Sequence, residues 1–232
     1  MTTAAGIDRI GTPRVHFRLT DSTNARAREL AGRGAPHGTV VTAAEQSAGR
    51  GRQGRTWTAP PGRGLLCSVL IRDPPRLLPL AAGVAVAETV GPDAQIKWPN
   101  DVLLGGRKVA GILVEARLQE RWAVVGIGLN VAVREADFPA ELRDRAGTLG
   151  LEPDAIEPTL AALLRALERW LAADSDAVLE AVRSRDALRG RGVRWGGQVG
   201  IAAGIDGDGR LVVRTEDGEV RLDAGEVHLG SA

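Results

Sequence analysis

The chain has 232 residues and an almost balanced charge, with 30 Lys and Arg against 29 Asp and Glu residues. This length suffices for one large domain, or for one domain with a small appendage. The balance excludes a bulk attraction to nucleic acid or to anionic lipid. The single cysteine, Cys67, excludes an internal disulfide and a cysteine-based metal site, and no apolar run approaches the ~20 residues that cross a membrane. We therefore expect a cytoplasmic protein without a membrane partner.

The first expected elements are a strand and a helix. Residues 15–19 alternate between apolar and polar side chains, as in a half-buried strand, after a small polar segment, 1–13, that we expect to fray. Residues 21–24 (DSTN) favour helix N-caps and precede the helix-forming residues 25–31. Two interpretations of 21–24 stay open. They form a plain cap, or their hydroxyl and amide groups bind the polar head of a ligand.

The most unusual stretch is residues 49–57, with the sequence GRGRQGRTW. Its glycines allow a ligand to approach the backbone closely, and its arginines suit phosphate or carboxylate oxygens. The indole of Trp57 offers a flat face to a base or another ring. A dinucleotide-binding turn is disfavoured because no helix begins at the third glycine, while a disordered nucleic-acid arm and a solvated turn stay open. We favour a loop that closes over an anionic ligand with a planar part, such as a nucleotide.

The middle of the chain alternates between buried strands and one core helix. An apolar helix is expected over residues 77–88, ending near Gly91. Gly105 and Gly106 stand between strand-like flanks, which predicts a β-hairpin. The expected strands cover residues 39–44, 65–71, 102–104, 108–115 and 122–131.

The last third of the chain changes character near residue 189. A helix opening near Asp154 has apolar residues at helical spacing, and a second helix is expected over 177–188. Five short alternating segments with glycine-rich turns between them then predict a small β-barrel. These segments are 193–195, 198–203, 211–214, 219–222 and 226–229.

A second group of polar residues follows a predicted strand. Lys97, Asn100 and Asp101 fall within five residues, and Lys108 lies on the return strand of the hairpin. A lysine beside a reacting phosphate can neutralise charge that develops on it. A nearby carboxylate can hold Mg²⁺ or accept a proton. Either lysine alone could instead be a solvated surface residue.

Taken together, the motifs resemble those of biotin protein ligases, the biotin–[acetyl-CoA-carboxylase] ligases. The resemblance covers about residues 15–230, and the β-rich tail is similar to the small C-terminal SH3-like domain of that family. The motifs that carry it, in family order, are residues 21–24 (DSTN), 49–57 (GRGRQGRTW), 97–101 (KWPND), 107–115 (RKVAGILVE) and 126–130 (GIGLN).

The resemblance implies an α+β fold, with a mixed-sheet catalytic domain over residues 1–188 and an SH3-like β-barrel over 189–232. It also implies that biotin and MgATP form biotinyl-5′-AMP, and that biotin then passes to a lysine of a biotin carboxyl carrier protein, a subunit of acyl-CoA carboxylase. A monomer or a homodimer is expected. Only about a dozen residues precede the first expected strand, too few for the DNA-binding domain of bifunctional members. We therefore expect no DNA partner.

The same resemblance assigns roles to individual residues. Asp101 is expected near the metal and as the acceptor of the lysine proton. The residues expected to act in catalysis are Lys108, Arg50, Arg52 and Asp101. Those expected to bind biotin are Ser22, Thr23, Asn24, Gln46, Gly49, Arg50, Arg52, Gly111 and Lys108. Those expected to bind ATP are Arg52, Arg55, Trp57, Lys97, Asn100 and Asn130.

Two alternative functions share features with this sequence. Lipoate or octanoate transfer is the nearest, because that family also acylates a lysine on a carrier domain, but it is not expected to carry the Arg/Gly run before Trp57. A nucleic-acid-binding module would use the same run, and the balanced charge argues against it. The three histidines, His16, His37 and His228, lack metal-ligand spacing and are interpreted as structural or solvated.

Overall fold

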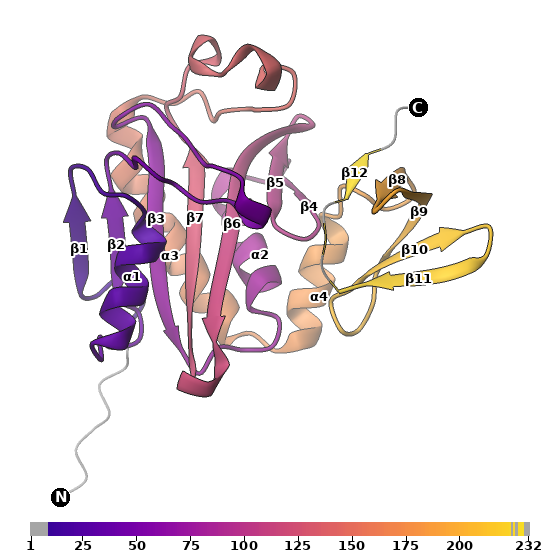
Figure 1. Ribbon diagram of the computed structural model, residues 1–232, viewed down its shortest axis with the longest axis horizontal. Coiled ribbons are helices and arrows are strands. Elements are labelled where there is room, and N and C mark those ends of the chain that lie inside the picture. The colour runs from indigo at the N-terminus through magenta and orange to yellow at the C-terminus, as the bar shows by residue number, and fades with distance from the viewer. Residues whose placement is uncertain (1–8, 224, 226, 230–232) are drawn as a thin grey trace, which may run out of the picture.

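The computed structural model describes residues 9–223, 225 and 227–229. The expected fraying of the N-terminus therefore lies mostly outside the described residues, as does residue 226 of the last expected strand. Within them, the chain forms a mixed sheet with helices on both faces, and a smaller antiparallel sheet near the C-terminus (Figure 1). This is the α+β fold that the sequence predicts. No helix in the described ranges is long and apolar enough to cross a membrane.

The large sheet has the strand order β1-β2-β3-β7-β6-β5-β4. Strands β1 and β2 pair in parallel, and the other neighbours pair antiparallel. The strands are β1 (Arg14–Phe17), β2 (Val40–Ala43), β3 (Gly64–Arg72), β4 (Gln95–Lys97), β5 (Asp101–Leu104), β6 (Arg107–Arg117) and β7 (Trp122–Asn130).

Helices cover both faces of this sheet. Helix α1 (Thr23–Gly32) packs on one face against Val41, Leu70 and Val124. Helices α2 (Leu78–Val90) and α3 (Ile156–Ala172) pack on the opposite face (Figure 1). Successive side chains of a strand point to opposite faces, so the central strands β3 and β7 are apolar along most of their length. The sequence shows this as long apolar runs, with Ser68 as a buried polar residue within β3, and most of the strand residues are buried.

The hairpin between β5 and β6 turns at Gly105 and Gly106, as predicted. Their φ angles are 58° and 78°, a left-handed conformation that glycine adopts without strain. The register of the β5–β6 pair shifts between Val102 and Leu103, where Val109 of β6 is the extra residue of a bulge. Lys108 of β6 and Asp101 of β5 are in contact across this pair.

The expected helix over 177–188 is shorter than predicted. Helix α4 covers Ser175–Ser184, and Asp186 forms an isolated parallel bridge with Ile96 of β4 instead. The Ile96 N–H donates to the Arg185 carbonyl at 2.7 Å, and the Ala187 N–H donates to the Ile96 carbonyl at 3.0 Å. Backbone groups at a sheet edge need partners, so pairing with β4 ends the helix early.

The tail is a small antiparallel sheet with the order β11-β10-β9-β8-β12, the SH3-like unit that the sequence predicts. Val193, Leu211 and Val213 are buried in its interior. Short 3₁₀ helices punctuate the connecting segments of the chain. The remaining elements are η1 (Arg52–Gly54), η2 (Leu118–Glu120), η3 (Glu135–Asp137), η4 (Ala140–Leu142), η5 (Pro153–Ala155), β8 (Gly192–Trp195), β9 (Gln198–Ile205), β10 (Leu211–Thr215), β11 (Gly218–Leu222) and β12 (His228–Leu229).

Candidate active site

A cavity of about 910 Å³ lies against the faces and ends of β4 to β7. The N-terminus of α1, the Arg/Gly loop and the segment after β7 complete its walls, so segments distant in sequence meet here. Gly49 is the one expected site residue that does not line this cavity. The expected residues that do are Ser22, Thr23, Asn24, Gln46, Arg50, Arg52, Arg55, Trp57, Lys97, Asn100, Asp101, Lys108, Gly111 and Asn130.

One end of the cavity is formed by the start of α1. The N–H and hydroxyl groups of Thr23 both donate to Oε1 of Gln46, at 2.7 and 3.1 Å. Ser22 occupies the N-cap position, but its side chain makes no capping bond. Gln46 therefore performs the capping that the sequence suggested for residues 21–24. Ser22 is buried, and its hydroxyl lies in the cavity wall.

Asn24 lies behind this end of the cavity and is already engaged. Its Oδ1 is 2.6 Å from the Ser68 hydroxyl, and its Nδ2 donates to Glu115 Oε2 at 2.8 Å. A Cβ on Gly126 would fall 2.0 Å from Asn24 Oδ1, so only glycine leaves room for this amide. Satisfied buried polar networks are rigid. The Ser68 hydroxyl also lies 2.8 Å from the Thr23 hydroxyl, so Asn24 and Thr23 belong to one buried network.

The Arg/Gly loop folds back on itself. The Trp57 N–H donates to the Gly49 carbonyl at 3.0 Å, and the Gly51 N–H donates to the Arg55 carbonyl at 2.7 Å. A Cβ on Gly49 would fall 2.3 Å from the Trp57 carbonyl oxygen. Gly49 therefore closes the loop through its backbone instead of lining the cavity. The sequence could not separate these two uses of a glycine.

Trp57 lies flat over two glycines of the sheet. A Cβ on Gly128 would fall 2.3 Å from its indole Cε2, and one on Gly111 would fall 3.1 Å from Cζ3. The Lys108 ammonium is 5.6 Å from the ring centroid, a cation–π distance. The indole Nε1 is buried without a hydrogen-bond partner in the described part of the chain. The space over Gly111, which the resemblance assigns to the ligand, thus holds Trp57 in this structure.

One loop arginine meets the wall of the cavity at Asn100, and another meets Glu115 of β6, which is not part of the cavity lining. Arg52 Nη1 donates to Asn100 Oδ1 at 3.1 Å, and Asn100 Nδ2 donates to the Ile112 carbonyl at 3.2 Å. Arg50 Nη1 lies 3.8 Å from Glu115 Oε1, in a half-exposed ion pair. Asn100 thus fixes the position of Arg52 relative to β6.

Two lysines and a carboxylate meet at the other end of the cavity. Lys108 Nζ lies 2.7 Å from Asp101 Oδ1, and Lys97 is the cross-strand partner of Asp101 in the β4–β5 pair. Both lysines line the cavity, as the sequence suggested. The pairing concentrates positive charge around one carboxylate.

The segment after β7 forms a wall of the cavity, which the sequence does not predict. Phe138, Leu142 and Arg145 line the cavity from this segment. The Lys108 N–H donates to the Arg145 carbonyl at 2.7 Å, and Asn130 Nδ2 donates to the Gly147 carbonyl at 2.9 Å. These contacts fix the segment across the ends of β6 and β7. Its sequence shows only turn and short-helix signals, because its place depends on long-range pairing.

The small C-terminal sheet also reaches the cavity. Arg194 of β8 and His228 of β12 are part of its lining, although His228 was interpreted as structural or solvated. Cys67 is buried, as expected, and burial raises the pKa of its thiol to about 12. A thiol that stays protonated is no nucleophile.

Comparisons with known proteins agree with these motifs. A model of the biotin/lipoate A/B protein ligase family matches residues 16–131, which hold all five motifs. A model of the biotin protein ligase C terminal domain matches residues 193–230. The biotin--[acetyl-CoA-carboxylase] ligase of Mycobacterium tuberculosis is 39% identical, with 90% of this chain and 86% of the relative aligned. The bifunctional ligase/repressor of Bacillus subtilis is 33% identical, with 95% and 75% aligned.

A solved structure extends the likeness to three dimensions. Biotin protein ligase from Aquifex aeolicus, in complex with biotin and ATP, superposes with a TM-score of 0.78 at 28% identity, covering 94% of this chain and 99% of that chain. The likeness includes the small C-terminal domain, whose family description names biotin protein ligases alone. The chain belongs to the biotin/lipoate A/B protein ligase family, as one of its biotin protein ligases.

Proposed function

We propose that this protein activates biotin with MgATP to biotinyl-5′-AMP and transfers biotin to a lysine of a biotin carboxyl carrier protein. The observation that carries the proposal is the single cavity that joins the polar pocket at the start of α1 to the cationic end at Lys108. Such a cavity suits a ligand with a neutral polar head and an anionic tail. Biotin, activated at its carboxylate by ATP, has this form.

The biotin ring would bind at the start of α1. Ser22, Thr23 and Gln46 present hydroxyl and amide groups there to a ureido head, with Asn24 supporting them. Gly111 leaves space above β6 for the chain of biotin once Trp57 moves away or packs beside it. In this arrangement the biotin carboxylate points toward Lys108.

The nucleotide would occupy the cationic end. We assign the contacts with the carboxylate and the α-phosphate to Lys108, Arg50 and Arg52, which line the cavity. Trp57 offers its indole face to the adenine ring. The other side chains that we assign to ATP are Lys97, Arg55, Asn100 and Asn130.

The first step needs positioning and charge neutralisation more than proton transfer. The carboxylate oxygen of biotin attacks the α-phosphorus of ATP in line, an O–P bond forms, and pyrophosphate leaves. No proton moves, so no general base is required. Lys108 and Arg52 neutralise the charge that develops on the α-phosphate oxygens.

Magnesium would enter with the nucleotide. Among the residues described, no three His, Cys, Asp or Glu side chains gather into a metal cage. The carboxylates of the cavity lining are Asp101 and Asp137, and Arg134 holds Asp137 and lowers its pKa. Mg²⁺ is commonly bound by one or two carboxylates together with substrate phosphates. We therefore assign Asp101 as its protein ligand, and the ion would neutralise phosphate charge.

The second step requires a base. The ε-ammonium of the carrier lysine must lose a proton before its nitrogen attacks the carbonyl carbon of the mixed anhydride. A C–N bond then forms, the C–O bond to the phosphate breaks, and AMP leaves. Asp101 is the carboxylate nearest to Lys108, and we assign it as the proton acceptor.

The expected partner is the carrier subunit of an acyl-CoA carboxylase, because a relative aligned over 86% of its length is named for the acetyl-CoA enzyme. We propose action in the cytoplasm, as a monomer or a homodimer. Balanced charge predicts no retention of DNA in a filter-binding assay at low salt.

Mass spectrometry of the carrier tests the function. The protein is incubated with biotin, MgATP and a carrier domain, and a parallel reaction contains lipoate in place of biotin. We expect the carrier to gain one biotinyl group and no lipoyl group. A carrier variant with its target lysine changed to arginine is the control and should gain nothing. Lipoyl transfer without biotinyl transfer would favour the lipoate alternative.

A further inference from the structure

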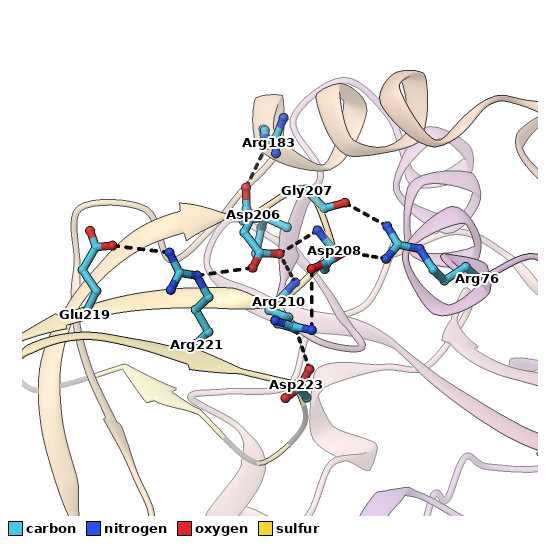
Figure 2. Close-up of polar contacts among 10 residues, drawn as sticks. Arg76, Arg183, Asp206, Gly207, Asp208, Arg210, Glu219, Arg221 and Asp223 are labelled. Atoms are coloured by element: carbon cyan, nitrogen blue, oxygen red, sulfur yellow. Dashed lines mark hydrogen bonds and ion pairs between the residues drawn. The ribbon is translucent and has the colours of Figure 1, made fainter.

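The turn between β9 and β10 leaves the small sheet and packs against the catalytic domain. Asp206 begins it, and its Oδ1 accepts hydrogen bonds from the N–H groups of Asp208 at 2.8 Å and Arg210 at 2.9 Å. Arg221 and Arg183 hold the base of the turn through Asp206 and the Ile205 carbonyl (Figure 2). These hydrogen bonds and this ion pair therefore stabilise the turn in one conformation.

The tip of this turn is fastened to the start of α2. Arg76 donates to Asp208 Oδ1 at 2.5 Å and to the Gly207 carbonyl at 2.9 Å (Figure 2). Gly209 has a φ of +82°, and a Cβ there would fall 2.8 Å from Leu80 Cδ1 and 2.9 Å from Leu77 Cδ2. Only glycine fits both this backbone conformation and this close approach.

The tip of the turn also contacts Trp98, which lies between β4 and β5 beside residues of the active site. The buried Trp98 indole donates its Nε1–H to the Gly209 carbonyl at 3.0 Å. A buried N–H without an acceptor is unfavourable, so this bond favours one orientation of Trp98. Two residues later, Asn100 receives Arg52, and the next residue, Asp101, pairs with Lys108. Trp98, which the turn contacts, is thus two residues from Asn100 and three residues from Asp101.

We propose that Gly209 and Trp98 are positioning residues for the nucleotide step. The β9–β10 turn holds Trp98, and Trp98 sets the place of Asn100 and Asp101 relative to Arg52 and Lys108. The part of the cavity assigned to the biotin ring, built from α1 and Gln46, lies outside this chain of contacts. The inference rests on the proposed function, since its readout is the formation of biotinyl-5′-AMP.

A matched pair of glycine variants tests the proposal. Gly209→Ala and Gly197→Ala strain the backbone alike, because the φ angles are +82° and +83°, but a Cβ on Gly197 meets no atom within 4 Å. We expect Gly209→Ala to lower kcat/KM for ATP by at least about tenfold, since small misplacement of reacting groups is costly. Gly197→Ala should change it less than about twofold, and both variants should keep the Kd for biotin.

A second pair removes the indole donor. Trp98→Phe keeps an aromatic ring but loses the bond to Gly209, and we expect a raised KM for ATP or a lowered kcat with unchanged biotin affinity. Trp170→Phe is the control, because its indole N–H donates to Glu88 Oε2 at 2.9 Å and neither residue lines the cavity. This pair decides the question if Gly209→Ala does not fold.

The outcomes separate this proposal from the function itself. If Gly209→Ala and Gly197→Ala lose equal activity, or if biotin affinity falls in proportion to adenylation, the positioning role is overturned. If the unaltered enzyme forms no biotinyl-5′-AMP from biotin and MgATP, the proposed function is overturned instead.

Discussion

At the scale of single residues, the contact between Lys108 and Asp101 concentrates the chemistry. The two side chains come from neighbouring strands and meet at 2.7 Å, inside a cavity that also receives the loop arginines. The lysine is thereby fixed where phosphate charge would develop, and does not sample the rotamers of a surface side chain. Its position favours a part in chemistry over a part in substrate affinity.

Changing Lys108 to Ala tests this. Biotin binding should stay within about tenfold, roughly 1.4 kcal/mol, while adenylate formation should slow by at least about two orders of magnitude. Single-turnover measurement of biotinyl-5′-AMP over a range of biotin concentrations gives both quantities. Lys108→Arg, which keeps the positive charge, should recover part of the rate. Near-normal adenylation by the alanine variant would remove Lys108 from the mechanism.

Cys67 provides a second prediction at this scale. It is fully buried, and its raised pKa of about 12 keeps the thiol protonated at mildly alkaline pH. Iodoacetamide, which reacts with the thiolate, should therefore modify the folded protein negligibly. The same reagent should label Cys67 rapidly in concentrated guanidinium chloride, as measured by intact mass. Fast labelling of the native protein would contradict the burial.

At the scale of elements, features that neighbouring residues decide could be predicted from the sequence, and features that long-range contacts decide could not. The Gly105–Gly106 hairpin was predicted because its turn chemistry is local. The end of α4 was predicted too late, because pairing with Ile96 decides it. The wall after β7 was missed for the same reason. Of the expected site residues, Gly49 alone does not line the cavity, since backbone sterics in the loop decide its role.

The Arg/Gly loop carries the prediction for this scale. Its backbone hydrogen bonds join loop residues to one another. Its contacts with the sheet include half-exposed charged pairs such as Arg50 with Glu115. Ordering such a segment costs roughly 1–2 kcal/mol per residue. We expect biotin to order it, and ATP then to bind more tightly because that cost has already been met.

Hydrogen exchange over residues 46–57 measures this ordering. Protection should rise when biotin is added, while β3 and β7 stay protected in both states and serve as the internal reference. Equal protection of the loop with and without biotin would refute the disorder-to-order account, even if the ligase activity is found.

At the scale of the whole molecule, the two sheets are linked through the active site. The composition change near residue 189 predicts a boundary between the parts, and that boundary stays a prediction. No sequence signal predicts that the β9–β10 turn meets Trp98. Such a contact depends on how the two parts pack. In the positioning proposal, this contact between Trp98 and Gly209 makes the nucleotide step of the catalytic domain depend on the tail.

Truncation at about Arg189 tests that dependence. The residues assigned to the biotin ring lie upstream, so the truncated chain should still bind biotin in calorimetry. It loses the Gly209 acceptor of Trp98 and the Arg194 and His228 parts of the cavity lining. ATP use and transfer to the carrier should therefore fall much further than biotin affinity. Circular dichroism confirms folding, and a folded chain without biotin affinity would contradict the proposed division.

Lys97 and Lys108, which both line the cavity, are also the only lysines in the chain. Every other basic side chain except histidine is an arginine, which stays protonated and does not accept an acyl group.

Arg52→Ala should weaken retention of the mixed anhydride and let it escape. We expect peptide mass spectrometry to find biotin on a lysine-rich bystander protein, but not on the enzyme beyond these two positions and any free α-amino group. Labelling elsewhere on the enzyme would contradict this. The enzyme would then make a reactive acyl donor to which its own surface is inert.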